Sequence, residues 1–191
     1  YFTDTYDPIW EVCEDLGIVI TQHGGTGVPN YKGNPATPFL LLMEVPFYAQ
    51  KSMWHFILGG VFERFPNLKY VMTEQGVSWV EPTLHRMDSI WDQMASTGRV
   101  GELGMTTDQM LPKKPSDYFQ QNCWIGASFP APSDAKSIQD IGVNNVMWGS
   151  DYPHTEGTYP HTREALRNTF AGWEENLSLI HISEPTRRYA I

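Results

Sequence analysis

Apolar and polar positions follow two periods along this chain, and the two periods alternate. Apolar residues at helical spacing predict amphipathic helices, whereas short β-branched runs bounded by Gly, Pro or Asn predict strands. Helices are expected at Tyr6–Leu16, Pro46–Phe65, Trp79–Met94, Ser133–Ile141 and Thr162–Ala171. Strands are expected at Ile18–Thr21, Leu68–Thr73, Val146–Ser150 and around Cys123–Ile125.

Strands that alternate with helices predict a parallel α/β sheet with right-handed crossovers. Four such units amount to half of an eight-stranded (β/α)8 barrel. The loops at residues 24–46 and 95–115 are expected to shape any pocket, and Met43, Met53, Met72 and Met87 are expected to fill the core.

Three titratable residues stand where predicted strands end. His23 follows the first strand, Glu74 follows the second, and Asp151 follows the fourth within "MWGSDYPHTEG". Taken singly, His23 and Asp151 fit ordinary turns and Glu74 fits the acidic first turn of a helix. Chemistry in parallel α/β folds collects at the carboxyl ends of strands, so their recurrence favours a functional site.

Composition narrows the classes of partner. The 191 residues carry 22 acids and 13 bases, a formal net charge of -9, and no basic run that would track phosphates, so nucleic acid is not expected as a partner. Cys13 and Cys123 form no C-x-x-C motif, which favours a reducing compartment and a cytoplasmic location. No apolar run is long enough to span a bilayer.

Three stretches resemble one known family. "NVMWGSDYPH" at Asn145–His154 is similar to the last-strand signature of the amidohydrolase-related family, the branch of the amidohydrolase superfamily that includes aminocarboxymuconate semialdehyde decarboxylase. "VFERFPNLKYVMTEQGVSW" at Val61–Trp79 resembles its passage into the sixth strand, and "PIWEVCEDLGIVITQHGG" at Pro8–Gly25 resembles its passage into the fifth. The likeness extends from Tyr1 to about Asn176.

The resemblance implies a distorted TIM barrel with one divalent metal ion, usually zinc. His23 matches the fifth-strand metal histidine, and Asp151 matches the last-strand aspartate that ligates the metal and handles the proton of the attacking water. The family's first strand supplies an H-x-H pair, and this sequence has none, so it corresponds to the C-terminal half of the barrel with two ligands absent. His154 and His161 are weaker candidates for contacts around the metal or the substrate, beside the alternative that they are solvated loop residues.

Glu74 stands where the decarboxylase branch has a catalytic histidine. A carboxylate cannot donate a neutral N–H, so hydrolysis of an ester, lactone or amide is expected, with Asp151 and Glu74 as catalytic residues and a small molecule as substrate. Non-oxidative decarboxylation is the alternative. A third hypothesis is a non-catalytic half-barrel that associates through its open sheet edges. A homodimer is common in the family.

The C-terminal tail interrupts the pattern. "LSLIHISEPTR" at Leu177–Arg187 has no counterpart in the family and back-translates smoothly to a transposase adapter of the kind used in sequencing libraries. Residues 177–191 are therefore expected to be adapter read-through, and residues 1–176 to be the native barrel segment.

Overall fold

A computed structural model describes residues 1–24, 29–100, 102 and 110–173. The strands are β1 (Val19–Gln22), β2 (Lys69–Thr73), β3 (Cys123–Ser128) and β4 (Val146–Gly149). The helices are α1 (Asp7–Asp15), α2 (Thr37–Leu58), α3 (Val61–Arg64), α4 (Val80–Thr97), α5 (Pro115–Asn122), α6 (Ala135–Ile141) and α7 (Thr162–Thr169). Short 3-10 turns lie at Asp4–Tyr6, Pro132–Asp134 and Val143–Asn145. The expected adapter segment, residues 177–191, lies outside the described residues.

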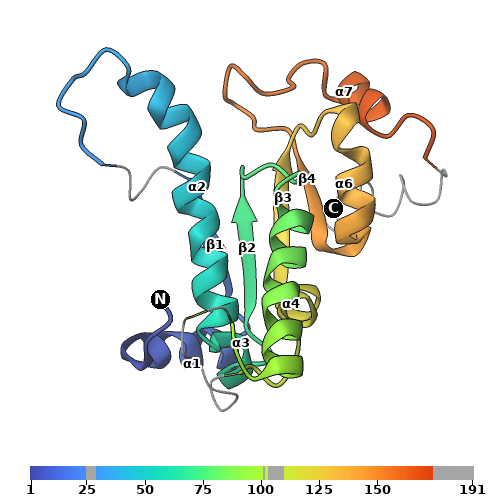
Figure 1. The fold of residues 1–191 in the computed structure, drawn as a ribbon. Helices are drawn as coiled ribbons and strands as arrows, with labels where there is room; N and C mark the ends of the chain where they lie inside the picture. Colours follow the sequence, from blue (N-terminus) through green and yellow to red (C-terminus); the bar gives the residue numbers. More distant parts are fainter. Residues whose placement is uncertain (25–28, 101, 103–109, 174–191) are drawn as a thin grey trace.

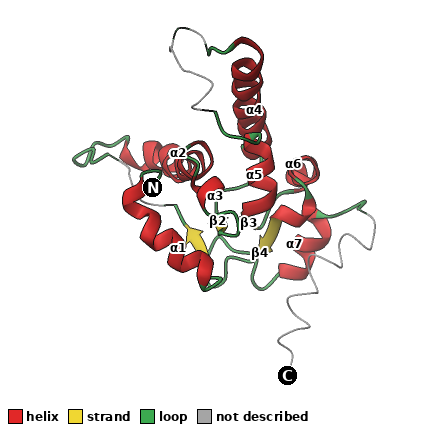
Figure 2. Ribbon diagram, turned by 90° about the horizontal axis from the view of Figure 1, so that it is seen from below, coloured by secondary structure: helices red, strands yellow, loops and turns green. Residues whose placement is uncertain are grey.

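The four strands form one parallel sheet in the order β1-β2-β3-β4. Val19 pairs with Lys69, Tyr70 with Cys123, and Ile125 with Val146, so the register advances in steps across the sheet. Each strand returns through at least one helix, and α2, α4 and α6 lie on the same face of the sheet (Figures 1 and 2). This arrangement confirms the predicted parallel α/β class.

The core lies between the sheet and these helices. Phe56 of α2 stacks on Tyr70 of β2 with ring centroids 4.6 Å apart, and Trp10 of α1 and Phe62 of α3 lie against the same Phe56 ring at 4.9 and 5.5 Å. Met53, Phe119 and Ile125 are fully buried beside them. Aromatic side chains of this size bury the most apolar surface per residue, so this cluster holds helices and sheet together.

The opposite face of the sheet is open at its two edge strands. Alternation along the strands puts Val19, Val71 and Met147 on that face. Val19 and Met147, on the edge strands, are 44% and 42% exposed, whereas Val71 on β2 is 8% exposed. In a closed barrel such positions point inward and are filled by facing side chains. The open face is therefore what half of a barrel presents.

The helix prediction at Pro46–Phe65 was wrong in its bounds. The helix expected at Pro46–Phe65 begins at Thr37, runs through Pro46 and ends at Leu58, and α3 follows separately. The chain turns at Gly60, whose φ of 69° is accessible to glycine without steric cost. Pro46 costs α2 one backbone hydrogen bond, but the apolar residues before it continue the helix.

Helix α5 was not predicted: a loop was expected at residues 95–115, and residues 116–122 were assigned to no element. Pro115 begins it, and the backbone N–H of Lys114 donates to Asp117 Oδ2 at 3.2 Å. Tyr118 and Phe119 are the large apolar side chains of its buried face. Met43, expected in the core, is also exposed. Among the described residues no helix is both long and apolar enough to cross a membrane.

Candidate functional site

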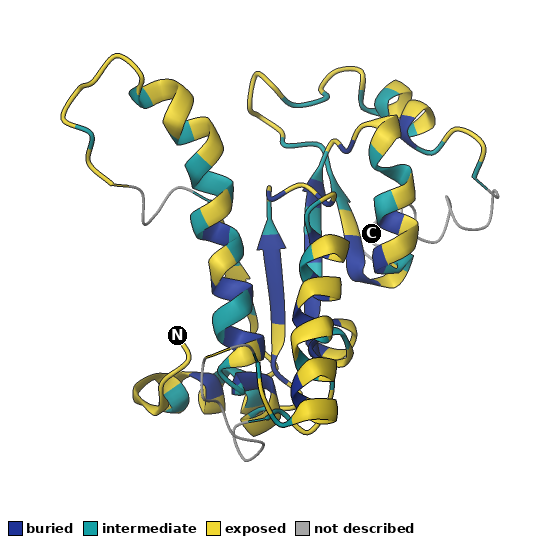
Figure 3. Cartoon of the chain, viewed as in Figure 1, coloured by how far each residue is buried: buried dark blue, intermediate teal, exposed yellow. Residues whose placement is uncertain are grey.

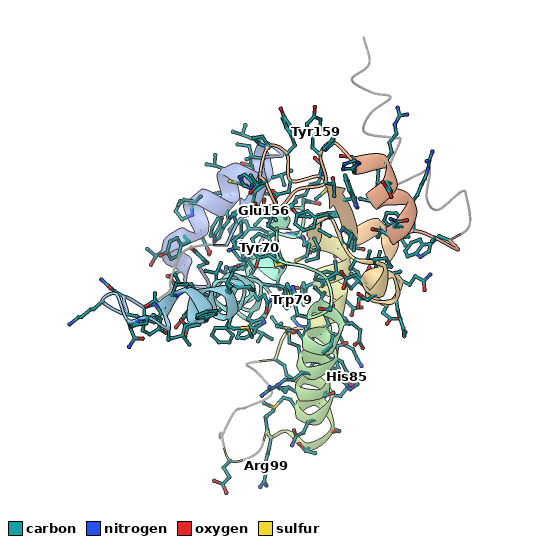
Figure 4. All side chains as sticks on the ribbon, turned by 90° about the horizontal axis from the view of Figure 1, so that it is seen from above. Tyr70, Trp79, His85, Arg99, Glu156 and Tyr159 are labelled. Carbon is teal, nitrogen blue, oxygen red and sulfur yellow. The ribbon has the colours of Figure 1, made fainter. Side chains whose placement is uncertain are left out.

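The titratable residues predicted from the sequence meet at one edge of the sheet. His23 follows β1 directly, Glu74 follows β2 directly, and Asp151 lies two residues after β4. Because all four strands are parallel, these positions share the carboxyl edge of the sheet. Figure 4 looks onto this edge, with Glu156 over the strand ends and Tyr159 at the margin of the view.

Three strands end in a left-handed residue. Glu74 has a φ of 57°, Asp151 of 58°, and Phe129, which follows β3, of 35°. The backbone N–H of Glu74 still donates to Gly126 O at 2.9 Å, so the ladder extends one residue past β2 before the chain turns. A residue with a side chain adopts this conformation at a cost of about 1–2 kcal/mol, and such strain concentrates at functional sites.

His23 is joined to Glu74. Its Nε2 lies 2.8 Å from Glu74 Oε2, and its Nδ1 lies 2.8 Å from the carbonyl oxygen of Gly24. Two acceptors favour an imidazolium that donates from both nitrogens. The hydrogen bond to Gly24 and the charge of Glu74 raise the pKa of His23 above 6.5, against an opposing effect of burial. The pair is open to solvent, since the His23 side chain is 60% exposed.

The side chain of Asp151 is largely buried and contacts His154. Its side chain is 8% exposed, and Oδ1 lies 3.2 Å from His154 Nδ1. The loop folds back on itself, because the N–H of His154 donates to Asp151 O at 2.9 Å and the N–H of Thr158 donates to Ser150 O at 3.0 Å. A Cβ on Gly157 would stand 2.7 Å from Ser150 O and 3.0 Å from Asp151 O. Only glycine therefore fits at position 157 without moving the Asp151 loop.

A hollow of about 300 Å³ opens between these groups. Its lining includes three carboxylates, Glu74, Asp151 and Glu156, together with Ser128 and Phe129. Glu156 was missed from the sequence. The only signal for it was an acid in the loop after the last strand, and the loop conformation, which the sequence did not predict, brings it to the hollow.

The donor set fits a divalent cation. One ligand atom each from Glu74, Asp151 and His154 lie within 4.8 Å of one another. Carboxylate oxygens and an imidazole nitrogen suit zinc and manganese, and a buried carboxylate beside further acids is stabilised by a bound cation. Among the described residues three candidate ligand residues come together here, so an ion held by them would keep coordination positions for other donors.

The three histidines predicted as site residues lie at different distances from the candidate metal site. His23, expected as a ligand beside Asp151, contacts Glu74 and lies outside the group of three. His154, a weaker candidate, lies inside it. His161 precedes α7, where its carbonyl accepts from the N–H groups of Glu164 and Ala165, and it is not among the residues that line the hollow.

Comparison with known proteins gives a family match and several matches in fold. A family model described as "Amidohydrolase" matches residues 1–188. A solved 5-carboxyvanillate decarboxylase from Sphingomonas paucimobilis matches at 24% identity and a TM-score of 0.73, covering 98% of this chain and 53% of its own. An amidohydrolase from Mycobacterium avium subsp. paratuberculosis matches at 21% identity and 0.70, covering 93% and 43%.

A dihydroxybenzoic acid decarboxylase from Polaromonas, solved with bound manganese and the inhibitor 2-nitroresorcinol, matches at 17% identity and a TM-score of 0.65, covering 95% of this chain and 52% of its own. This chain therefore spans about half the length of the solved structures it matches. The family match also runs past residue 176, so the origin of residues 177–191 stays a prediction.

Proposed function

Because this chain belongs to the amidohydrolase family, we propose that the complete enzyme is a metal-dependent hydrolase of an ester, lactone or amide, with its site at the carboxyl edge of this sheet. The observation that carries the proposal is the convergence of Glu74, Asp151 and His154 from two strand ends within 4.8 Å, with His23 bound to Glu74. A bound divalent ion would supply Lewis-acid activation of water and of the substrate carbonyl. Zinc is the ion we propose.

Asp151 and His154 are placed to hold the ion. His23 is proposed as a further ligand on the family resemblance, although its imidazole contacts Glu74 in this structure. Asp151 is well suited to this task, because its buried carboxylate lies against His154 in a loop fastened by backbone hydrogen bonds. The additional donors implied by the family resemblance belong to residues outside this sequence.

Glu74 is placed to move a proton. His23 engages Oε2, and Oε1 makes no hydrogen bond to the described residues, so Oε1 is available to accept the proton of the attacking water. The same carboxyl group then returns that proton to the leaving oxygen or nitrogen. In this structure the 2.8 Å contact with His23 fixes the position of Glu74 Oε2.

Non-oxidative decarboxylation is a second candidate. The likeness to two decarboxylases in fold favours it. Release of CO2 requires an acid that protonates the carbon left behind, and Glu74 donates only in its protonated form. Hydrolysis uses Glu74 as an acceptor, and Glu74 Oε2 already lies 2.8 Å from His23 Nε2 as its hydrogen-bond acceptor.

The two free cysteines, Cys13 and Cys123, fit a reducing compartment, and cytoplasmic location is part of this proposal.

The test uses the complete enzyme, purified with zinc. Aryl esters, lactones and amides are assayed by acid release, and hydroxybenzoates by CO2 release, before and after removal of metal by chelation and dialysis. We expect acid release that is lost on chelation, restored by zinc, and lowered about 10²–10⁴-fold by Glu74→Gln. Activity that survives metal removal would exclude metal dependence, and CO2 release without acid release would favour the decarboxylase.

A further inference from the structure

Helices α2 and α4 border an apolar groove on the outside of the molecule. Both helices pack on the same face of the sheet, and the outer side of α4 is exposed along its length (Figure 3). The groove has a volume of about 530 Å³, and its walls include Trp54, Leu58, Met87 and Ile90. Sites for small molecules have volumes of about 300–1,000 Å³. The groove shares no lining residue with the hollow at the strand ends, so it is a separate candidate site.

A second apolar pocket continues this groove along α4. It has a volume of about 160 Å³ and shares Leu58, Met87 and Ile90 with the groove. Further along α4 it is lined by Trp91 and Met94, and all the described residues that line it are apolar. Positions 87, 90, 91 and 94 are three or four residues apart and therefore form one stripe on the helix. The two pockets together are called the α4 groove below.

The α4 groove carries charge at one end. Arg86 is the only charged side chain among the described residues that line it, and it lies in the wall of the larger pocket. The ion pairs of the described residues all involve other cations, so no carboxylate neutralises Arg86. The indole N–H of Trp54, in the same wall, also has no hydrogen-bond acceptor among the described residues. This end therefore offers donors that have no partner, and an anion would supply the acceptor.

The length of the groove restricts the shape of its ligand. Arg86 and Met94 are about 12 Å apart along α4 at 1.5 Å per residue. A compact anion would pair with Arg86 and leave the apolar part of the groove in contact with water. A ligand with a hydrocarbon chain would cover the whole stripe, and removal of this apolar surface from water favours binding. The smaller volume of the second pocket favours a single flexible chain over a fused ring system.

We propose that the α4 groove binds a straight-chain aliphatic carboxylate, with the carboxylate on the guanidinium of Arg86 and the hydrocarbon chain along α4 towards Met94. Charge complementarity selects this class of ligand. An aliphatic alcohol of the same length would leave Arg86 without an anion. An aliphatic ammonium ion would place a like charge beside Arg86, which is unfavourable.

The first test is calorimetric titration of the whole chain with decanoate below its micelle concentration. One molecule is expected to bind, and Arg86→Gln is expected to raise the dissociation constant at least tenfold. Ile90→Glu, which places a carboxylate in the apolar wall at a position that is 39% exposed, is expected to raise it at least tenfold as well. The matched controls are Arg163→Gln on α7 and Val12→Glu on α1, which replace exposed side chains outside the groove and are expected to bind as the wild type does. Circular dichroism checks that each variant is folded.

The second test keeps the hydrocarbon chain and changes the head group. Decanol and decyltrimethylammonium are expected to bind at least tenfold more weakly than decanoate. Equal binding of the three ligands would show that the groove attracts hydrocarbon without regard to charge and would overturn the proposal. Absence of decanoate binding in the wild type, or equal affinity in Arg86→Gln and the wild type, would also overturn it.

The third test locates the chain in the groove. Decanoate brominated at its terminal carbon quenches the fluorescence of neighbouring tryptophans, and the quenching is expected to fall more in Trp91→Phe than in Trp54→Phe. The reverse order would place the end of the chain beside Arg86 and would overturn the proposed orientation. Sedimentation velocity tests the remaining alternative: a dimer that decanoate does not dissociate and that Ile90→Glu does dissociate would assign the groove to a second copy of the chain.

Discussion

The left-handed conformation of Glu74 leads to a prediction about stability as well as activity. Two substitutions, Glu74→Gly and Glu74→Ala, remove the same carboxylate and the same contact with His23. They differ only in a Cβ, so their comparison isolates the backbone at a φ of 57°. Because the His23 side chain is 60% exposed, the loss of the ion pair itself contributes little to either variant.

The size of the difference follows from opposing terms. A side chain in the left-handed region costs about 1–2 kcal/mol, which glycine avoids. Glycine also loses more backbone entropy on folding, about 0.5–1 kcal/mol relative to alanine. Glu74→Gly is therefore expected to be about 1 kcal/mol more stable than Glu74→Ala, the reverse of the order found within helices and strands. For a chain of this length the difference corresponds to about 2–4 °C in melting temperature.

Equilibrium urea unfolding followed by tryptophan fluorescence measures this difference. Both variants are expected to lose the proton transfer assigned to Glu74, so the more stable of the two is as inactive as the other. If Glu74→Ala proved as stable as Glu74→Gly, the argument that position 74 is held in a strained conformation would be refuted.

Three further predictions concern the core, the histidine and the loop. Phe56→Ala is expected to lower the free energy of unfolding in urea by about 3–5 kcal/mol, because the ring is buried against Tyr70. Phe39→Ala, at an exposed position of α2, should lower it by less than about 0.5 kcal/mol. Similar losses in the two variants would contradict the packing described. Because the pKa of His23 is raised, its ion pair stabilises the fold fully below pH 6.5 and loses this effect as the pH rises through the raised pKa. An NMR titration should show a lower pKa of His23 in Glu74→Gln than in the wild type. An unchanged pKa would exclude the contact. Gly157→Ala is expected to weaken divalent-metal binding about 10–100-fold in calorimetry with little change in unfolding, whereas unchanged affinity would show that the loop tolerates a Cβ.

The sequence predicts the ends of the strands well and the ends of the helices less well. Short β-branched runs such as Ile18–Thr21 have few alternatives, so the strands were predicted close to their observed positions, and Glu74 and Asp151 follow β2 and β4 as expected. The start of α2 was misplaced because Pro46 fits the first turn of a helix as well as its interior, and local pattern does not distinguish the two. Helix α5 has only two large apolar side chains in its buried face, too few for a periodic signal.

The site could be predicted as a set of residues but not as a set of contacts. Parallel strands guarantee that His23, Glu74 and Asp151 share an edge. The contacts between these side chains depend on the stagger of the strands and on the path of the loop after β4. The stagger lets His23 contact Glu74. His154 approaches Asp151, and Glu156 approaches the hollow, because the loop turns back through the hydrogen bond from Thr158 N–H to Ser150 O. Neither feature leaves a pattern in the sequence.

The central claim is that the strand-end residues of this chain hold a divalent ion. Calorimetric titration with zinc tests this claim most directly. The account predicts that the wild-type chain binds one ion, that Asp151→Asn lowers the affinity at least tenfold, and that Glu81→Gln, an acid in the first turn of α4, leaves it unchanged. Failure of the wild-type chain to bind zinc or manganese, or equal affinity in Asp151→Asn and the wild type, would contradict it.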